Sequence, residues 1–174
     1  IDIVSMFKPI VKWNTSIYSP DVVPEVVRKA FKLAELEKPG ATHFELPEDI
    51  AKIEVNDRLK PLTKIRLRRS APDYKTIIQF VQMLKDAKRP IILAGNGAIR
   101  KLASKHLREF VTKTNIPVIP TFMGKGAISD RDEHSLITMG MSGSDIAKNA
   151  FAKSDLVICV GYDIAEVGPE RWNP

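Results

Sequence analysis

The stretch 89–98 constrains the fold of this chain more than any other part of it. Pro90 leads into the uncharged apolar run 91–94, which ends at Gly95-Asn96-Gly97. A short apolar run between a proline and two glycines is typical of a buried strand in a parallel sheet, and the amphipathic segment 102–111 is typical of a helix. The order strand, tight turn, helix predicts the first unit of a doubly wound sheet, with the glycines at the strand end where such sheets bind ligands.

The same order recurs further along the chain. A second apolar segment, 116–120, enters the loop 121–127, and a third, 156–160, ends at Gly161. Between them the loop 139–143 precedes a helix that carries Ile146, Ala147, Ala150 and Phe151. The carboxyl ends of parallel strands lie at one edge of a sheet, so we expect the glycine-containing loops to form a crevice there.

The chain before residue 73 has a different pattern. Apolar residues recur at helical spacing from Val22 to Ala34, and Lys38-Pro39-Gly40 ends that helix. Residues 42–46 alternate as in a half-buried strand, and residues 51–72 show neither period. The sequence therefore predicts a partial α/β segment over 1–50, a linker over 51–72, and an incomplete three-layer α/β/α, Rossmann-like domain over 73–174.

Two finer expectations concern burial in the second part. Asp73 is expected to cap a helix whose inward stripe comprises Ile77, Ile78, Val81 and Leu84. Cys159, the single cysteine, stands inside an apolar run and is expected to be a buried, unreactive thiol.

Composition excludes several classes of protein. With 44% hydrophobic and 28% charged residues in 174, the chain is typical of a globular protein. Apart from 64–69, basic residues alternate with acidic ones, so the net charge of +6 indicates no nucleic-acid partner. No apolar run approaches about 18 residues and no signal peptide is evident, so we expect no membrane partner and a cytoplasmic location.

The loops carry an incomplete nucleotide-binding motif. Gly95-Asn96-Gly97 begins like the dinucleotide fingerprint, but Arg100 stands where its third glycine belongs, so a classical NAD site is not expected. A nucleotide lying differently across the loops stays open, because backbone N–H groups can donate to phosphates. Arg100 and Lys125 would add charge to such a site, although solvation of the loop edges is their favoured role.

Other polar residues give no complete catalytic pattern. Asp163 and Glu166 follow the last strand, and capping or contact with a neighbouring segment is the favoured interpretation. His43 and Glu45 share a strand face, where a solvated or interface position is favoured over an acid/base pair. The scattered histidines and the lone cysteine offer no metal-ligand spacing.

The order of several short motifs is similar to one known family. These are Phe7-Lys8-Pro9-Ile10-Val11-Lys12, Lys38-Pro39-Gly40, Leu46-Pro47-Glu48-Asp49-Ile50, the stretch 89–97, Ile116-Pro117-Val118, Met123-Gly124-Lys125-Gly126 and Gly140-Met141-Ser142-Gly143. Over nearly its whole length the chain resembles the large catalytic subunit of thiamine-diphosphate-dependent acetolactate synthase. The resemblance places residues 1–50 at the end of the pyrimidine-binding domain and residues 73–174 in most of the central domain.

The resemblance implies a transferase of the carboligase type for the parent protein. That enzyme decarboxylates pyruvate and joins the two-carbon unit to a second 2-oxo acid, in branched-chain amino acid or acetoin metabolism. It uses thiamine diphosphate and Mg²⁺, whose motifs are expected before Ile1 and after Pro174, so the fragment alone is expected to be inactive. Its expected partners are the remaining domains of the parent, which is expected to be a homo-oligomer.

The last loop resembles the catabolic type of the family, which works without FAD. Tyr162-Asp163-Ile164-Ala165 replaces a flavin-contacting Ala-Arg-Phe-Asp run, and Ser142 replaces a frequent histidine, so FAD is not favoured. If a flavin or ADP-like ligand binds, the resemblance places it against Gly95, Asn96, Gly97, Thr121, Phe122, Met123, Gly140, Met141, Ser142 and Gly161. No catalytic or metal-binding residue is assigned.

Three alternatives stay open from the sequence. One is a self-sufficient module that binds ADP, FAD or a similar nucleotide. Another is a different thiamine-diphosphate enzyme, such as pyruvate oxidase or glyoxylate carboligase. The third is an interaction role in which residues 1–50 pair two chains.

Overall fold

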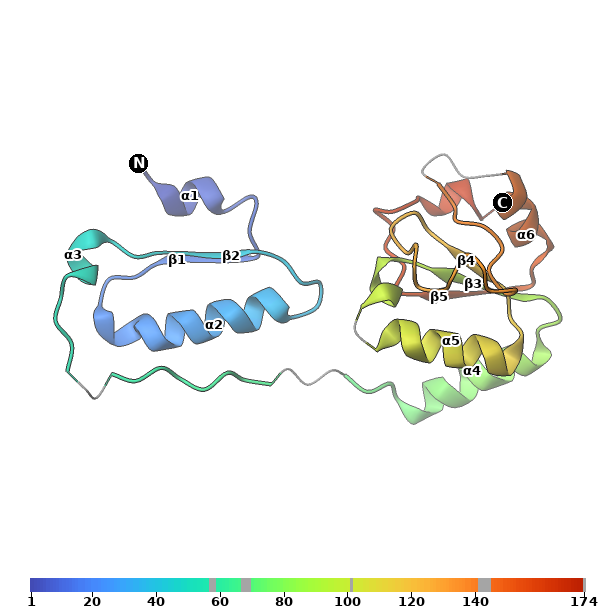
Figure 1. Cartoon of the computed structure of the whole chain (residues 1–174), viewed down its shortest axis with the longest axis horizontal. Helices are drawn as coiled ribbons and strands as arrows, with labels where there is room; N and C mark the ends of the chain where they lie inside the picture. The colour runs from blue at the N-terminus through green and yellow to red at the C-terminus, as the bar shows by residue number, and fades with distance from the viewer. Residues whose placement is uncertain (57–58, 67–69, 101, 141–144, 174) are drawn as a thin grey trace. The chain divides into compact units, whose positions relative to one another are not determined.

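The computed structural model describes residues 1–56, 59–66, 70–100, 102–140 and 145–173 (Figure 1). The chain divides into two compact units, Ile1–Ala71 and Pro72–Pro174. The boundary falls at the end of the segment predicted to be a linker. Each unit is described by itself.

The first unit contains a small parallel sheet with helices around it. Its elements are α1 (Ile3–Phe7), β1 (Trp13–Ser16), a 3-10 turn (Pro20–Val22), α2 (Val23–Glu35), β2 (Thr42–Glu45) and α3 (Glu48–Ala51). β1 pairs with β2 in parallel, with Trp13 opposite Thr42 and Ser16 opposite Glu45. Neither α1 nor β1 was predicted from the sequence. The residues of β1, Trp-Asn-Thr-Ser, show no apolar alternation, so this segment becomes a strand only through its pairing with β2.

The starts of β1 and β2 are held by polar contacts with the helix α2. Thr42 at the start of β2 donates its hydroxyl to the carbonyl of Ala30 at 3.1 Å. The Lys12 ammonium donates to the carbonyls of Leu33 and Leu36, at 2.7 and 2.8 Å. Those carbonyls belong to the last turn and the C-cap of α2, where a cation is favourable because it complements the helix dipole.

The face of β2 opposite Thr42 supports α1 and has no acid/base arrangement. The His43 ring stacks on Phe7 of α1, with 4.2 Å between centroids and 3° between planes. Its Nδ1 atom is buried and has no hydrogen-bond partner. His43 therefore packs inside its own unit and is not solvated, and a role of this strand face in an interface stays a prediction.

The second unit is built on three parallel strands. Its elements are α4 (Tyr74–Asp86), β3 (Pro90–Ala94), a 3-10 turn (Asn96–Ile99), α5 (Ala103–Thr114), β4 (Val118–Pro120), α6 (Asp145–Lys153), β5 (Leu156–Val160) and a 3-10 turn (Pro169–Arg171). The sheet order is β4-β3-β5, with Ile92 opposite both Val118 and Ile158. The expected parallel sheet, with β3 as its central strand, is confirmed.

A further stretch of chain runs beside β4 without becoming a named strand. Isolated parallel bridges join Val118 to Ser135 and Thr121 to Met139. Backbone hydrogen bonds accompany them, among them Met139 N to Pro120 O at 2.8 Å. The order across the sheet is therefore segment 135–139, β4, β3 and β5. The chain moves outward from β3 through β4 to this segment and then crosses back to place β5 on the other side of β3. The point between β3 and β5 is therefore a topological switch.

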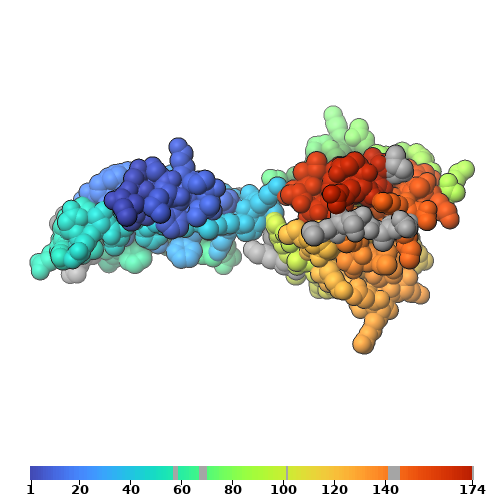
Figure 2. Space-filling view, turned by 90° about the horizontal axis from the view of Figure 1, so that it is seen from above, coloured from blue at the N-terminus to red at the C-terminus, as the bar shows by residue number. Residues whose placement is uncertain are grey.

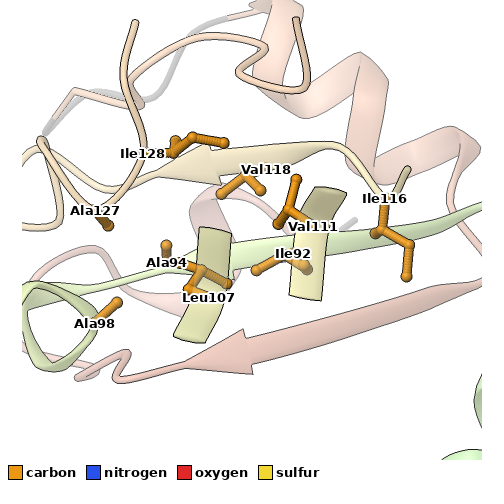
Figure 3. Packing of buried hydrophobic residues seen from close by; sticks show 9 residues of the cluster. All are labelled: Ile92, Ala94, Ala98, Leu107, Val111, Ile116, Val118, Ala127 and Ile128. Carbon is orange, nitrogen blue, oxygen red and sulfur yellow. The ribbon is translucent and has the colours of Figure 1, made fainter. Parts of the chain in front are cut away.

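Helices cover both faces of this sheet. On one face, Leu107 and Val111 of α5 pack on Ile92 and Ala94 of β3, with Val118 of β4 beside them (Figure 3). On the other face, α6 lies over the sheet with the C-terminal segment, which is coloured red in Figure 2. The central residues Ile92, Leu93 and Ala94 are fully buried, as the apolar run predicted.

Two burial predictions for the second unit were wrong. Ile77, Ile78 and Val81 of α4 are 42%, 51% and 41% exposed, and of the predicted stripe only Leu84 packs against the core. Cys159 is exposed, because it lies on β5 at an edge of the three-stranded sheet and no described segment pairs with that edge. Partial desolvation raises the pKa of the Cys159 thiol, which disfavours the reactive thiolate.

Asp155 fastens the beginning of β5 to the beginning of β3. Its carboxylate accepts the backbone N–H groups of Lys88 and Arg89, both at 2.8 Å. These hydrogen bonds to backbone N–H groups hold the pKa of Asp155 below its ordinary value of 3.8. The ionised carboxylate therefore stabilises the folded state above that pH, and the contribution fades as the pH falls through the lowered pKa.

We expect Asp155→Asn to lower the urea midpoint of the second unit, because one amide oxygen cannot replace two carboxylate oxygens as acceptors. Tryptophan fluorescence in a Trp13→Phe background reports on this unit through Trp172. The difference from the unsubstituted chain should be clear at neutral pH and should shrink as the pH falls through the lowered pKa of Asp155, because the carboxylate then becomes protonated.

The matched control for this experiment is Glu133→Gln, a neutralisation at an exposed position of the same unit. Equal midpoints for Asp155→Asn and the parent chain at neutral pH would contradict a fastening role for Asp155.

Candidate functional site

The loops that follow β3, β4 and β5 meet at one edge of the sheet, which we call the rim. They comprise residues 95–98, 121–127 and 161–166. The sequence predicted this meeting from the position of the glycines, and the parallel pairing of the three strands confirms it. The rim includes the switch point between β3 and β5, where open α/β sheets usually bind ligands.

At the rim the glycines allow backbone to pack on backbone. A Cβ atom added at Gly97 would lie 2.7 Å from Gly161 Cα, and one added at Gly95 would lie 2.5 Å from Tyr162 Cα. Gly161 has a φ of 61°, in the left-handed region that favours glycine. A Cβ added at Gly124 would overlap the carbonyl of Ala94. The loops thus fill much of the space that a glycine-rich cradle would leave for a ligand.

The backbone donors of the first loop are satisfied within the chain. Gly95 N donates to Val160 O at 2.9 Å, Gly97 N to Gly161 O at 2.8 Å, and Ala98 N to Gly95 O at 2.9 Å. Asn96 N donates to the carboxylate of Glu166 at 2.9 Å. A phosphate at this loop would therefore have to displace existing hydrogen bonds.

The Glu166 carboxylate joins all three loops. Its Oε1 accepts Asn96 N at 2.9 Å and Asp163 N at 3.2 Å, and its Oε2 accepts the hydroxyl of Thr121. Thr121 in turn accepts Gly124 N at 3.0 Å through its own Oγ1. Glu166 is 6% exposed and Thr121 is fully buried. The favoured prediction for Glu166, contact with a neighbouring segment, is confirmed.

Aromatic residues fix the segment that carries Glu166. Trp172 packs edge-on against Tyr162 with 5.7 Å between centroids, and at 5.2 Å from Phe151 of α6. The indole N–H donates to the Tyr162 hydroxyl at 3.3 Å, and that hydroxyl donates to the carbonyl of Val167. The chain around Glu166 is therefore held on both sides.

The described residues among those proposed to contact a nucleotide lie at or beside one edge of the sheet, since Met139, which precedes Gly140, is bridged to Thr121. Gly95, Asn96, Gly97, Thr121 and Gly161 come together at the rim. Phe122 and Met123 extend the second loop and are 36% and 44% exposed. Gly140 follows the segment beside β4, and an added Cβ there meets nothing within 4 Å. Met141 and Ser142 lie outside the described residues, so part of the predicted ligand set has no described position.

The cationic residues considered for phosphate binding are occupied or at the edge. The Lys125 ammonium lies 3.4 Å from a carboxylate oxygen of Asp130, and both side chains are largely exposed. Arg100 is half-buried just after the first loop. Solvation of the loop edge, the favoured role, fits the exposed Lys125–Asp130 pair.

The rim does not fit the magnesium ion that the resemblance implies for the parent. Both carboxylate oxygens of Glu166 already accept hydrogen bonds, whereas Mg²⁺ needs oxygen atoms that are available for coordination. Among the described residues, no group of three or more His, Cys, Asp or Glu side chains is placed to hold a metal ion.

In the part of the chain that the structure describes, no helix has the length and apolar character needed to cross a bilayer.

A separate hollow of about 560 Å³ lies within the first unit, between α2 and residues 59–65. Val27, Phe31, Leu62 and Ile65 are among its apolar lining residues. At its border Arg28 pairs with Glu25 and Lys64 with Glu35. The side chains of both ion pairs are partly or largely exposed.

Comparison with known proteins identifies the family. A sequence profile described as the central domain of thiamine pyrophosphate enzymes matches residues 77–174, more than half of the chain. The chain belongs to the thiamine pyrophosphate enzyme family. The match covers the sheet, both helical layers and the rim described above.

Relatives extend the similarity into the first unit. Proteins named probable acetolactate synthase large subunit, from Methanococcus aeolicus and Methanocaldococcus jannaschii, are each 36% identical over 92% of this chain. The acetolactate synthase large subunit of Corynebacterium glutamicum is 32% identical over the same share. The chain spans only 26–28% of the length of these relatives. The resemblance stated from the motifs is thereby confirmed.

Sequence reasoning missed the cooperation between Glu166, Thr121 and Asn96. Thr121 and Glu166 are 45 positions apart and Asn96 and Glu166 are 70 apart, so no local spacing relates them. The only available signal was that a carboxylate followed one strand and a hydroxyl followed another, at the same edge of one sheet.

We expect Gly97→Ala to destabilise the second unit by about 1–3 kcal/mol, because its methyl group would press on the backbone of Gly161. Gly140→Ala is the matched control, since its methyl group meets open space, and it should leave the midpoint almost unchanged. Urea unfolding in the Trp13→Phe background measures both. Equal effects of the two substitutions would contradict the close packing of the rim.

Proposed function

We propose that this chain is part of a thiamine-diphosphate-dependent acetolactate synthase, in which its second unit serves as a supporting central domain. The parent would decarboxylate pyruvate and transfer the two-carbon unit to a second 2-oxo acid. The observation that carries the proposal is the similarity over 92% of the chain to proteins named acetolactate synthase large subunits.

The rim supports a structural role for this domain. Its glycines pack on one another, the N–H groups of Gly95, Asn96, Gly97 and Ala98 donate within the chain, and its buried carboxylate is held by three donors. No nucleophile or acid/base pair lies among these groups. Thiamine diphosphate, when bound to the parent, would supply the electron sink for decarboxylation. The residues of this chain would provide packing around that centre.

Several finer features of the parent stay predictions. They are Mg²⁺ as the metal, a homo-oligomeric assembly, a cytoplasmic location and a role in branched-chain amino acid or acetoin metabolism. Pyruvate oxidase and glyoxylate carboligase are the alternative activities within the family.

A nucleotide-binding role remains the second candidate because Phe122 and Met123 present exposed apolar side chains beside the rim. An adenine or flavin ring could lie on such a surface. This role predicts saturable heat on titration of the chain with ADP or FAD, lost in a Phe122→Ser/Met123→Ser double variant. Absence of binding at millimolar ligand would remove it.

The test of the main proposal is a chimera. We expect the Methanocaldococcus jannaschii relative, with its matching segment replaced by this chain, to form acetolactate from pyruvate with thiamine diphosphate and Mg²⁺. The chain alone should form none under the same conditions. The matched control is the same relative carrying the corresponding segment of the Methanococcus aeolicus protein.

Two results would count against this proposal. One is a chimera that folds and assembles like the control but forms no acetolactate. The other is thiamine-dependent product from the chain alone, because the domain would then be catalytic and not supporting.

A further inference from the structure

The buried carboxylate of Glu166 has the surroundings of a bound anion. It is 6% exposed, yet no described Lys, Arg or His side chain forms an ion pair with it. A buried charge without an opposite charge is costly unless hydrogen bonds replace its hydration. Here two backbone N–H groups, from Asn96 and Asp163, and the hydroxyl of Thr121 provide that replacement.

The Glu166 carboxylate also lies at the edge of the sheet where open α/β sheets usually bind a ligand. Asn96 follows β3 and Asp163 follows β5, the two strands between which the chain reverses across the sheet, and Thr121 follows β4 on the other side of β3. Open α/β sheets bind their ligands at such a point. In this chain the side chain of Glu166 occupies that position.

The donors are held in place independently of Glu166. Gly95 and Gly97 are bonded to Val160 and Gly161, and Thr121 N donates to Ala94 O at 2.8 Å. On the other side, Trp172 packs against Tyr162, the neighbour of Asp163. The donors should therefore keep their arrangement when the carboxylate is removed, because each belongs to a strand end that is fixed by the sheet.

We propose that Asn96 N, Asp163 N and Thr121 Oγ1 form an anion site whose resident ligand is the Glu166 carboxylate, and that an external carboxylate binds there when this one is removed. Glu166 is then a positioning residue, which joins the three loops by supplying the anion they share. This inference does not depend on the function proposed for the whole enzyme.

Glu166→Ala provides the test in the full 174-residue chain. The substitution removes the same carbon and oxygen atoms that make up acetate, so sodium acetate is the matched probe. We expect the variant to unfold at a lower temperature than the unsubstituted 174-residue chain, which is called the parent chain below. Acetate at several times its Kd should raise the midpoint of the variant by about 5 °C more than that of the parent chain, with saturation.

Four controls separate anion binding from general salt effects. Sodium chloride at equal ionic strength and acetamide, a neutral molecule of the same shape, should not reproduce the rise. Glu166→Gln fills the space, so acetate should not stabilise it. Glu133→Ala removes an exposed carboxylate from the same unit and should respond to acetate as the parent chain does.

Amide hydrogen exchange provides a local readout. In Glu166→Ala the N–H groups of Asn96 and Asp163 should exchange faster than in the parent chain, and acetate should slow them again. Inorganic phosphate, used in place of acetate, tests the breadth of the site: a saturable rise extends it to phosphoryl groups, and no rise limits it to planar carboxylates. Either phosphate result is compatible with the proposal when acetate binds.

The proposal is overturned if acetate stabilises Glu166→Ala no more than it stabilises the parent chain and Glu133→Ala. It is also overturned if Glu166→Ala shows no cooperative unfolding in acetate or in chloride, because the donors would then not hold their arrangement. Recovery of cooperative unfolding in acetate alone would support it. Failure of the acetolactate chimera would leave the acetate result unaffected, so the two proposals fail separately.

Discussion

The second unit depends on the pairing of β3 with a strand on each side. Ile92, Leu93 and Ala94 are fully buried, so their backbone groups must find partners in β4 and β5 and their side chains must find helices on both faces. This double requirement sets the register of the sheet. It also brings three strand ends into line, and every contact of the rim follows from that alignment.

The rim shows how glycine-rich loops can serve packing in place of ligand binding. A glycine after a parallel strand is needed wherever backbone approaches closely, and the approaching group can be a phosphate or another loop. Here Gly97 meets Gly161, and the donors beside them bond to carbonyls and to Glu166. The loop sequence alone does not distinguish these cases, because it specifies the space around the backbone and not its occupant.

The fold of the second unit was largely predictable, since its signals are local. The apolar runs predicted β3 and β5, and helical spacing predicted α5. Predictions failed where the environment decides the outcome. Ile77, Ile78 and Val81 have the spacing of a buried stripe, yet α4 contacts the core through Leu84 instead. Cys159 stands in an apolar run but lies on an edge strand. In the first unit, β1 escaped prediction because pairing with β2, and not its own composition, makes it a strand.

The sequence by itself determined the class of fold, the position of the glycine loops at strand ends and the resemblance to thiamine-dependent carboligases. These features rest on periodicity and short motifs, which are written in neighbouring residues. Only the tertiary structure decided that Glu166, Thr121 and Asn96 meet, and that the rim is occupied by the chain itself. Those contacts join residues far apart in the chain, and their geometry exists only after the parallel strands have aligned.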